Sequence, residues 1–136
     1  MKKYMTSDVR EKLQELSSDI RYLMNELNII TQVEGREREI TLDMAFIVAA
    51  GLSKSLHDLY HLANNAYTER LDMTGKEDTE EGAFVADLYF LYQEFLSALG
   101  SMYDAMKYRF DNDPVTYAHD RMKPLPNALD HWAEGK

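Results

Sequence analysis

Seven apolar residues near the start of the chain are separated by alternating intervals of four and three residues: Val9, Leu13, Leu16, Ile20, Leu23, Leu27 and Ile30. Because an α-helix turns once in about 3.6 residues, this spacing places all seven side chains along one stripe of a helix. Thr6 offers an N-cap ahead of the stripe, and Gly35 follows it inside a charged run. The spacing predicts a helix over residues 7–32 that buries one face.

A second apolar stripe with heptad spacing predicts a helix over residues 41–74. Thr41 is a suitable N-cap, Gly51 is a possible kink, and Gly75 is expected to end the helix. The stripe consists of Leu42, Ala45, Ala49, Leu52, Leu56, Leu59, Ala63 and Ala66. Four of its eight positions are Ala, which lets a neighbouring helix approach closely.

The third predicted helix, residues 79–111, carries two adjacent apolar stripes. The first consists of Phe84, Leu88, Leu91, Phe95, Ala98, Met102 and Ala105. The second consists of Val85, Tyr89, Tyr92, Leu96, Leu99, Tyr103, Met106 and Phe110. A helix on the surface of a bundle needs only one stripe, so this helix is predicted to be central or to form a subunit interface.

The remaining residues leave room only for short helices. Pro124 and Pro126 predict two pieces, residues 114–122 and 127–134, joined by an extended segment. The chain has 136 residues and no Cys, which fits a single domain over residues 1–136 and excludes a disulfide scaffold. We therefore predict an all-α, elongated, antiparallel three-helix bundle with a short helical C-terminal extension.

His57 and His61 are four residues apart on one helical face, with Asp58 next to the first imidazole. This spacing lets two rings reach one metal ion and resembles the zinc-binding HExxH pattern, with Asp in place of Glu. A third ligand would have to come from His119, Asp120 or His131. The alternative is that both rings flank the apolar stripe without binding a metal, and this is the interpretation we favour.

Other catalytic patterns are missing from the sequence. It contains no GxSxG, P-loop or GxGxxG motif, and the repeated Glu-x-x-His pairs of a di-metal carboxylate bundle are absent. We therefore expect a protein without cofactors that is not an enzyme. A metal-dependent hydrolase that uses His57 and His61 remains the minority alternative.

The formal charge of −9 is concentrated in one part of the chain. From Glu69 to Asp104 there are nine acidic residues and two basic ones. Such a surface repels phosphate backbones, which excludes direct nucleic-acid binding through it, and steers a partner with a basic surface. One alternative is an acidic inhibitor that mimics phosphates and occupies a partner's nucleic-acid-binding groove. The residues expected to contact a partner are Asp72, Glu77, Asp78, Glu80 and Glu81.

Basic residues are expected to form at most a small patch, because each has acidic neighbours in the sequence. They are Arg36, Arg38, Lys107, Arg109, Arg121 and Lys123.

The second stripe of the third predicted helix suggests self-association, because the chain's other helices are too few to cover it. Large amphipathic Tyr and flexible Met side chains suit contact surfaces. The residues expected at a homodimer interface are Tyr89, Tyr92, Leu96, Tyr103 and Met106.

The first residues lack the apolar core of a secretory signal, and the longest apolar run, residues 44–52, is too short to cross a bilayer. We expect a cytoplasmic protein with no membrane partner. The predicted function is that of a protein–protein interaction module: an adaptor, assembly component or inhibitor that acts through an acidic helical surface as a homodimer.

Overall fold

The computed structural model describes residues 2–135, and these form five α-helices without a strand. They are α1 (Ser7–Ile30), α2 (Gly35–Thr74), α3 (Thr79–Lys107), α4 (Asp113–Met122) and α5 (Leu125–Glu134). The prediction of an all-α fold is confirmed. Among the described residues, no helix is long and apolar enough to cross a membrane.

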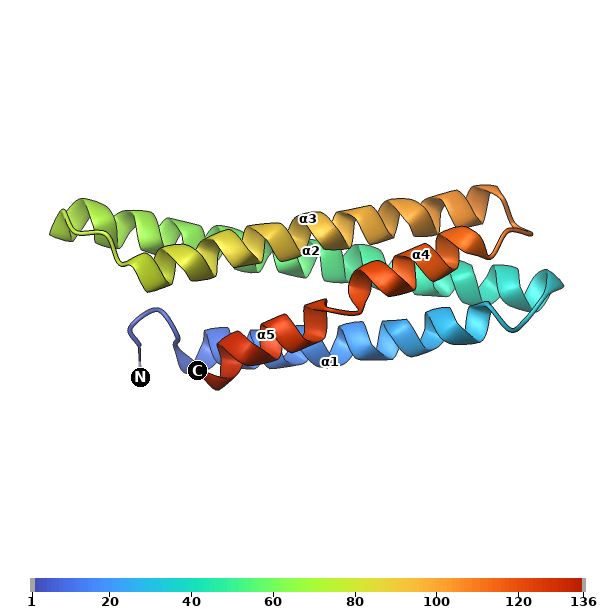
Figure 1. Cartoon of the computed structure of the whole chain (residues 1–136), viewed down its shortest axis with the longest axis horizontal. Helices are drawn as coiled ribbons and strands as arrows, with labels where there is room; N and C mark the ends of the chain where they lie inside the picture. The colour runs from blue at the N-terminus through green and yellow to red at the C-terminus, as the bar shows by residue number, and fades with distance from the viewer. Residues whose placement is uncertain (1, 136) are drawn as a thin grey trace.

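The helices lie side by side in an elongated bundle (Figure 1). α2 packs against both α1 and α3, and successive long helices run in opposite directions. The two short helices follow one another beside the long helices, with α4 packed against α3 and α5 packed against α1 (Figure 1). At 40 residues, α2 is about 60 Å long, given a rise of 1.5 Å per residue.

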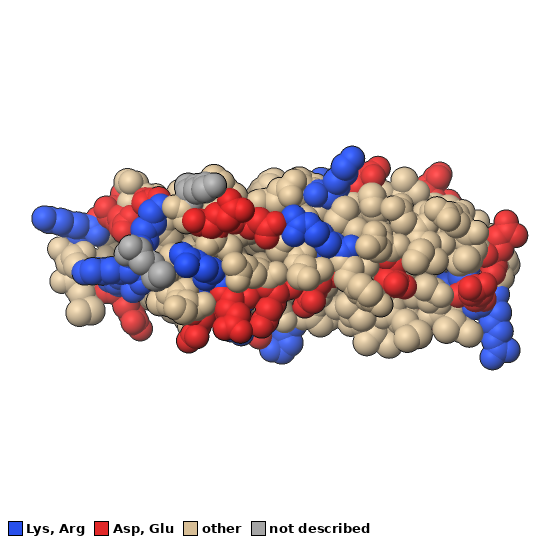
Figure 2. All heavy atoms as spheres, turned by 90° about the horizontal axis from the view of Figure 1, so that it is seen from below, with Lys and Arg blue, Asp and Glu red and all other residues tan. Residues whose placement is uncertain are grey.

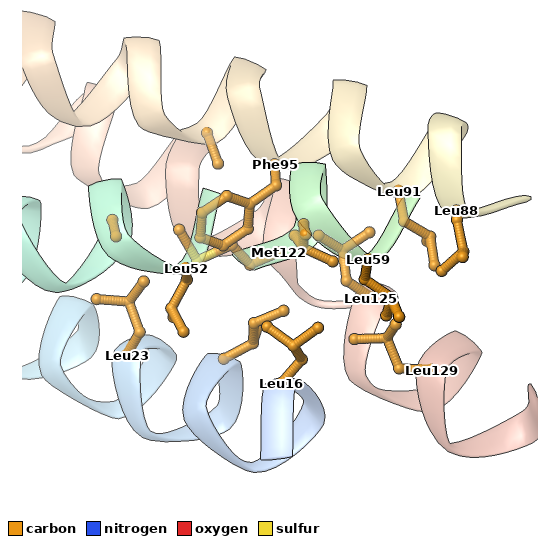
Figure 3. Packing of buried hydrophobic residues seen from close by; sticks show 14 of the residues in the cluster. Leu16, Leu23, Leu52, Leu59, Leu88, Leu91, Phe95, Met122, Leu125 and Leu129 are labelled. Carbon is orange, nitrogen blue, oxygen red and sulfur yellow. The ribbon is translucent and has the colours of Figure 1, made fainter. Parts of the chain in front are cut away.

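The core receives side chains from all five helices. Figure 3 shows Leu16 of α1, Leu52 of α2, Phe95 of α3, Met122 of α4 and Leu125 of α5 pointing toward a common interior. The seven residues of the first predicted stripe are all at most 8% exposed. The short helices therefore complete the core of the bundle, and the expected arrangement of three helices with an extension was too narrow a description.

Polar contacts also tie α5 to α1. The Ser17 hydroxyl is buried and donates to the carbonyl of Pro126 at 3.3 Å. Arg21 donates to the carboxylate of Asp130 at 2.6 Å and to the side-chain oxygen of Asn127 at 3.1 Å. These bonds fix the position of α5 along α1.

The first turns of α2 differ from the prediction, because the helix begins at Gly35 and not at Thr41. Arg38, expected in a small basic patch, is only 3% exposed. Its guanidinium donates to the side chain of Asn112 at 2.9 Å and to backbone carbonyls of the α3–α4 connection. The charged run around Gly35, which was expected to lie between two helices, is therefore part of α2, and Arg38 holds it against the neighbouring connection.

The other bounds lie closer to the predictions. α1 ends at Ile30, two residues before the expected end, and α3 ends at Lys107, four residues early. Gly75 ends α2 in the left-handed conformation, with a φ of 65°. Gly51 lies within the uninterrupted helix α2.

Candidate functional site

The acidic end of the bundle consists of the five predicted partner-binding residues Asp72, Glu77, Asp78, Glu80 and Glu81. Four of them are exposed around the α2–α3 connection. Asp78 is the N-cap of α3, and its carboxylate accepts hydrogen bonds from the backbone amides of Glu80 and Glu81 at 3.1 and 3.0 Å. Glu80 pairs with Lys2, so part of this charge is neutralised within the chain.

Glu81 differs from the other four because it is only 1% exposed. Arg70 donates from Nε to both of its carboxylate oxygens, at 3.0 and 3.1 Å, and this pairing raises the pKa of the Arg70 guanidinium. A buried, paired carboxylate is unavailable to a partner. The expectation that Glu81 belongs to the partner-binding surface was wrong, since its burial and ion pair give it a role within the fold.

His57 and His61 lie on the outer side of α2, and their Nε2 atoms are 3.0 Å apart. His57 also packs against the ring of Tyr92 at 5.3 Å between centroids. Asp58 is held by Lys54 at 2.8 Å, and this hydrogen bond lowers the pKa of the Asp58 carboxyl. The spacing thus does bring the two imidazoles together. However, the described residues contain no group of three or more His, Cys, Asp or Glu side chains that could hold a metal ion.

The candidate third ligands are engaged elsewhere. His119 of α4 lies 3.3 Å from the carboxylate of its neighbour Asp120. His131 of α5 packs edge-on against Trp132, with 6.0 Å between the centroids.

The predicted self-association residues lie along the outer edge of the seam between α2 and α3. The ring of Tyr89 contacts Tyr60 at 5.2 Å, and that of Tyr103 contacts Phe46 at 6.4 Å between centroids. Leu96 and Met106 are half-buried. Side chains of α2 therefore cover the second stripe of α3 in part, although the chain's other helices were expected to be too few to cover it.

Three of the four arginines of the expected basic patch, Arg38, Arg109 and Arg121, make bonds within the chain. Arg109 donates to Asp43, and Arg121 to Glu94, each at 2.9 Å. With Arg38 buried, these residues anchor the bundle and do not form a cationic surface.

An exposed apolar surface that was not predicted from the sequence lies over α1 and α2. We call it the α1–α2 apolar face; its residues are Tyr22 (62% exposed), Ile40 (49%), Met44 (64%), Ile47 (71%) and Val48 (43%). Four of these side chains line a shallow groove whose floor includes the buried residues Leu23 and Ala45. Figure 2, seen from below the view of Figure 1, shows a broad area without charged side chains in the right-hand half, toward the end where α1 meets α2.

A signal for this face was present in the sequence. Ile40, Met44 and Ile47 are spaced by four and three residues, offset from the predicted stripe of the same helix. The helix was expected to begin only at residue 41, so Ile40 lay outside it and the offset stripe was not recognised.

The geometry of the molecule thus offers apolar contact at one face and negative charge at one end. No family model, no curated protein and no solved structure matches this chain, so its function has to be argued from these surfaces.

Proposed function

We propose that the protein is a non-enzymatic protein–protein interaction module that binds its partners through the α1–α2 apolar face. The observation that carries this proposal is the exposure of its five apolar side chains, each between 43 and 71% exposed. Together they expose on the order of 600 Å² of mainly apolar surface, the upper end of what a typical monomer presents. Exposed apolar patches of this size are typical of surfaces that contact other proteins.

The acidic end adds long-range attraction for a basic partner. Asp72, Glu77 and Glu80 are exposed, and clustered negative charge raises the association rate with a positively charged surface. The alternative of a phosphate mimic has less support, because Asp78 and Glu81 are committed to the N-cap and to the Arg70 ion pair. In this proposal the acidic end raises the association rate, and the α1–α2 apolar face supplies the binding affinity.

The hydrolase alternative is also weaker than the interaction proposal. His57 and His61 supply two imidazoles on one turn of α2. A catalytic zinc needs three protein ligands and an open position. Residues 2–135 contain no group of three or more His, Cys, Asp or Glu side chains that could hold a metal ion, although the Asp58 carboxylate lies 3.6 Å from Nδ1 of His57.

An affinity capture from native lysate tests the proposed function. We expect Ile47→Glu to abolish specific capture, because a charge on the apolar face must be desolvated on binding. The triple variant Asp72→Asn, Glu77→Gln, Glu80→Gln should weaken capture severalfold at low salt and little at high salt, because exposed charges are screened beyond about 8 Å at physiological ionic strength.

The matched control removes three exposed acids elsewhere: Glu11→Gln, Asp104→Asn and Asp120→Asn. If it weakens capture as much as the first triple variant, net charge and not the acidic end is responsible. If Ile47→Glu captures the same proteins as the wild type, the apolar face is not the binding surface and the proposal fails.

A further inference from the structure

We infer that a second copy of this chain binds the α1–α2 apolar face, with residues 37–54 of α2 packed antiparallel against the same segment of the other copy. The inference rests on the proposed function, since it names a second copy as the partner of the same face. The acidic end lies outside residues 37–54, so attraction of a basic partner there is separate from this interface. It is carried by the pattern of exposed residues along α2, by their charges and by one glycine.

Six exposed residues of α2 form a second heptad stripe, separate from the stripe that faces the core. Their intervals are three, four, three, four and three residues: Glu37, Ile40, Met44, Ile47, Gly51 and Lys54. Such spacing is the pattern of a seam between two packed helices. No described helix of this chain covers it, because all six positions are exposed.

The stripe is complementary to itself when the two helices run in opposite directions. With the two-fold axis between Met44 and Ile47, each Met44 faces the second copy's Ile47, and each Ile40 faces the second copy's Gly51. Glu37 then faces the second copy's Lys54 at both ends of the seam. These ends are 17 residues apart, or about 25 Å along the helix.

Charge disfavours the parallel arrangement. Parallel helices in register would place Glu37 against Glu37 and Lys54 against Lys54, and like charges across a seam are destabilising. The Lys54 side chain is 77% exposed in its contact with Asp58, which leaves it accessible to a second carboxylate. The charges therefore select the two-fold antiparallel dimer.

Gly51 supports the same interface, because the fold of one chain gives no reason for it. It lies in the interior of α2, where glycine weakens a helix relative to alanine. Apart from the adjacent residues and the nearby backbone of α2 itself, no described atom lies within 4 Å of the position that a Cβ of residue 51 would occupy. In the seam, the missing side chain leaves space for the second copy's Ile40 and lets the two backbones approach closely.

The surface approaches the size that a stable dimer buries on each partner. The apolar face exposes on the order of 600 Å², against about 800 Å² per partner in a standard stable interface. Glu37, Gly51 and Lys54 extend the contact beyond the apolar side chains. The stripe on α3 is less suited, because Tyr92, Leu96 and Met106 are half-buried. Tyr89 and Tyr103 are 49% and 57% exposed, but their rings contact α2.

Sedimentation equilibrium of the purified full chain tests the interface without any other protein present. We expect a dimer for the wild type and a monomer for Ile47→Glu. Leu62→Glu is the matched control, because Leu62 is 54% exposed on the same helix but lies outside residues 37–54. It should remain dimeric, and circular dichroism should show that both variants keep the helical content of the wild type.

A charge exchange tests the register. Glu37→Lys and Lys54→Glu should each weaken dimerisation roughly tenfold, because each replaces two attractive pairs with two repulsive ones. The double variant restores opposite charges and should return the dissociation constant to near the wild-type value. If the double variant is no tighter than the single variants, the antiparallel register is wrong.

Two outcomes overturn the inference as a whole. One is a wild type that stays monomeric at every accessible concentration. The other is a dimer that survives Ile47→Glu but is lost in Tyr103→Glu, which would place the interface on α3. A monomer that still captures a lysate protein through Ile47 would refute the dimer and leave the proposed function standing.

Discussion

Single buried charges anchor both ends of this bundle. Arg38 reaches from the first turns of α2 into the α3–α4 connection, and Glu81 of α3 pairs with Arg70 of α2 beside the α2–α3 connection. Burial lowers the pKa of the Arg38 guanidinium, and its bonds to carbonyl oxygens compensate for lost hydration. At this scale, residues that look like surface charges in the sequence determine where helices begin and end.

Replacing Arg38 should therefore be costly. Arg38→Met keeps the aliphatic volume but leaves the carbonyl of Asp111 and the side chain of Asn112 without their donor. We expect a loss of about 2–4 kcal/mol in the free energy of unfolding, measured by urea denaturation. Arg36→Met, at an exposed position two residues earlier, should change it by less than about 0.5 kcal/mol. Equal effects of the two substitutions would contradict the anchoring role.

Tyr4 provides the opposite case, a buried polar group that lacks compensation. Its hydroxyl has no hydrogen-bond partner among the described residues, while its ring stacks on Phe84 at 5.4 Å between centroids. Tyr4→Phe keeps the ring and should stabilise the protein by roughly 1 kcal/mol. Tyr22→Phe, at an exposed position, should leave the free energy of unfolding unchanged.

The pH dependence gives Tyr4→Phe a second measurement. Burial, with the nearby charges of Asp78 and Glu81, raises the pKa of Tyr4 above its ordinary value. Above a pH of about 10 the unfolded chain ionises this phenol while the folded chain keeps it neutral, so wild-type stability falls as pH rises. The gap between Tyr4→Phe and the wild type should widen in urea titrations above that pH. A constant gap would show that Tyr4 ionises equally in both states.

Helix α3 contains two glycines, and the contacts within the chain explain only one of them. Gly100 lies in its interior, is exposed, and has no described atom within 4 Å of the position that a Cβ would take. Gly82 lies in the first turn, where a Cβ would come 3.2 Å from the hydroxyl oxygen of Tyr67. Only the second glycine is constrained by its surroundings.

Gly100→Ala is therefore expected to stabilise the protein by about 0.5–1 kcal/mol, because alanine restricts the unfolded chain and favours the helix. Thermal unfolding followed by circular dichroism measures the gain. Gly82→Ala serves as the comparison and should gain less, since the methyl group must displace Tyr67. A Gly100→Ala variant less stable than the wild type would show that the backbone there makes a contact beyond the single chain.

Elements with one apolar stripe and clear caps could be predicted from the sequence. The structure has α1 within two residues of the predicted range because Thr6 caps it and seven core residues define its face. The start of α2 could not be predicted, since it depends on Arg38 meeting a connection more than 70 residues away. The packing of α4 and α5 depends likewise on long-range contacts, such as the bond from Ser17 to Pro126.

At the scale of the whole molecule, the candidate surfaces depend on which faces other helices cover. The sequence identified apolar and acidic residues correctly as types, but it placed the second stripe of α3 at a homodimer interface and Glu81 on the partner-binding surface. Both assignments required knowing that α2 packs against α3 along its length. The α1–α2 apolar face could not be predicted, because its exposure depends on where α4 and α5 pack. They cover α3 and a different side of α1, and they leave this face exposed.

The bonds between α1 and α5 join residues 109 positions apart in the chain. Helices α1, α2 and α3 can pair with their neighbours as they emerge from the ribosome, because their contacts are between adjacent segments. The surface of α1 that packs against α5 lacks this partner until residues 126–130 have been synthesised. During translation, Ser17 and the apolar side chains beside it therefore stay exposed to solvent or to a chaperone until α5 has been synthesised.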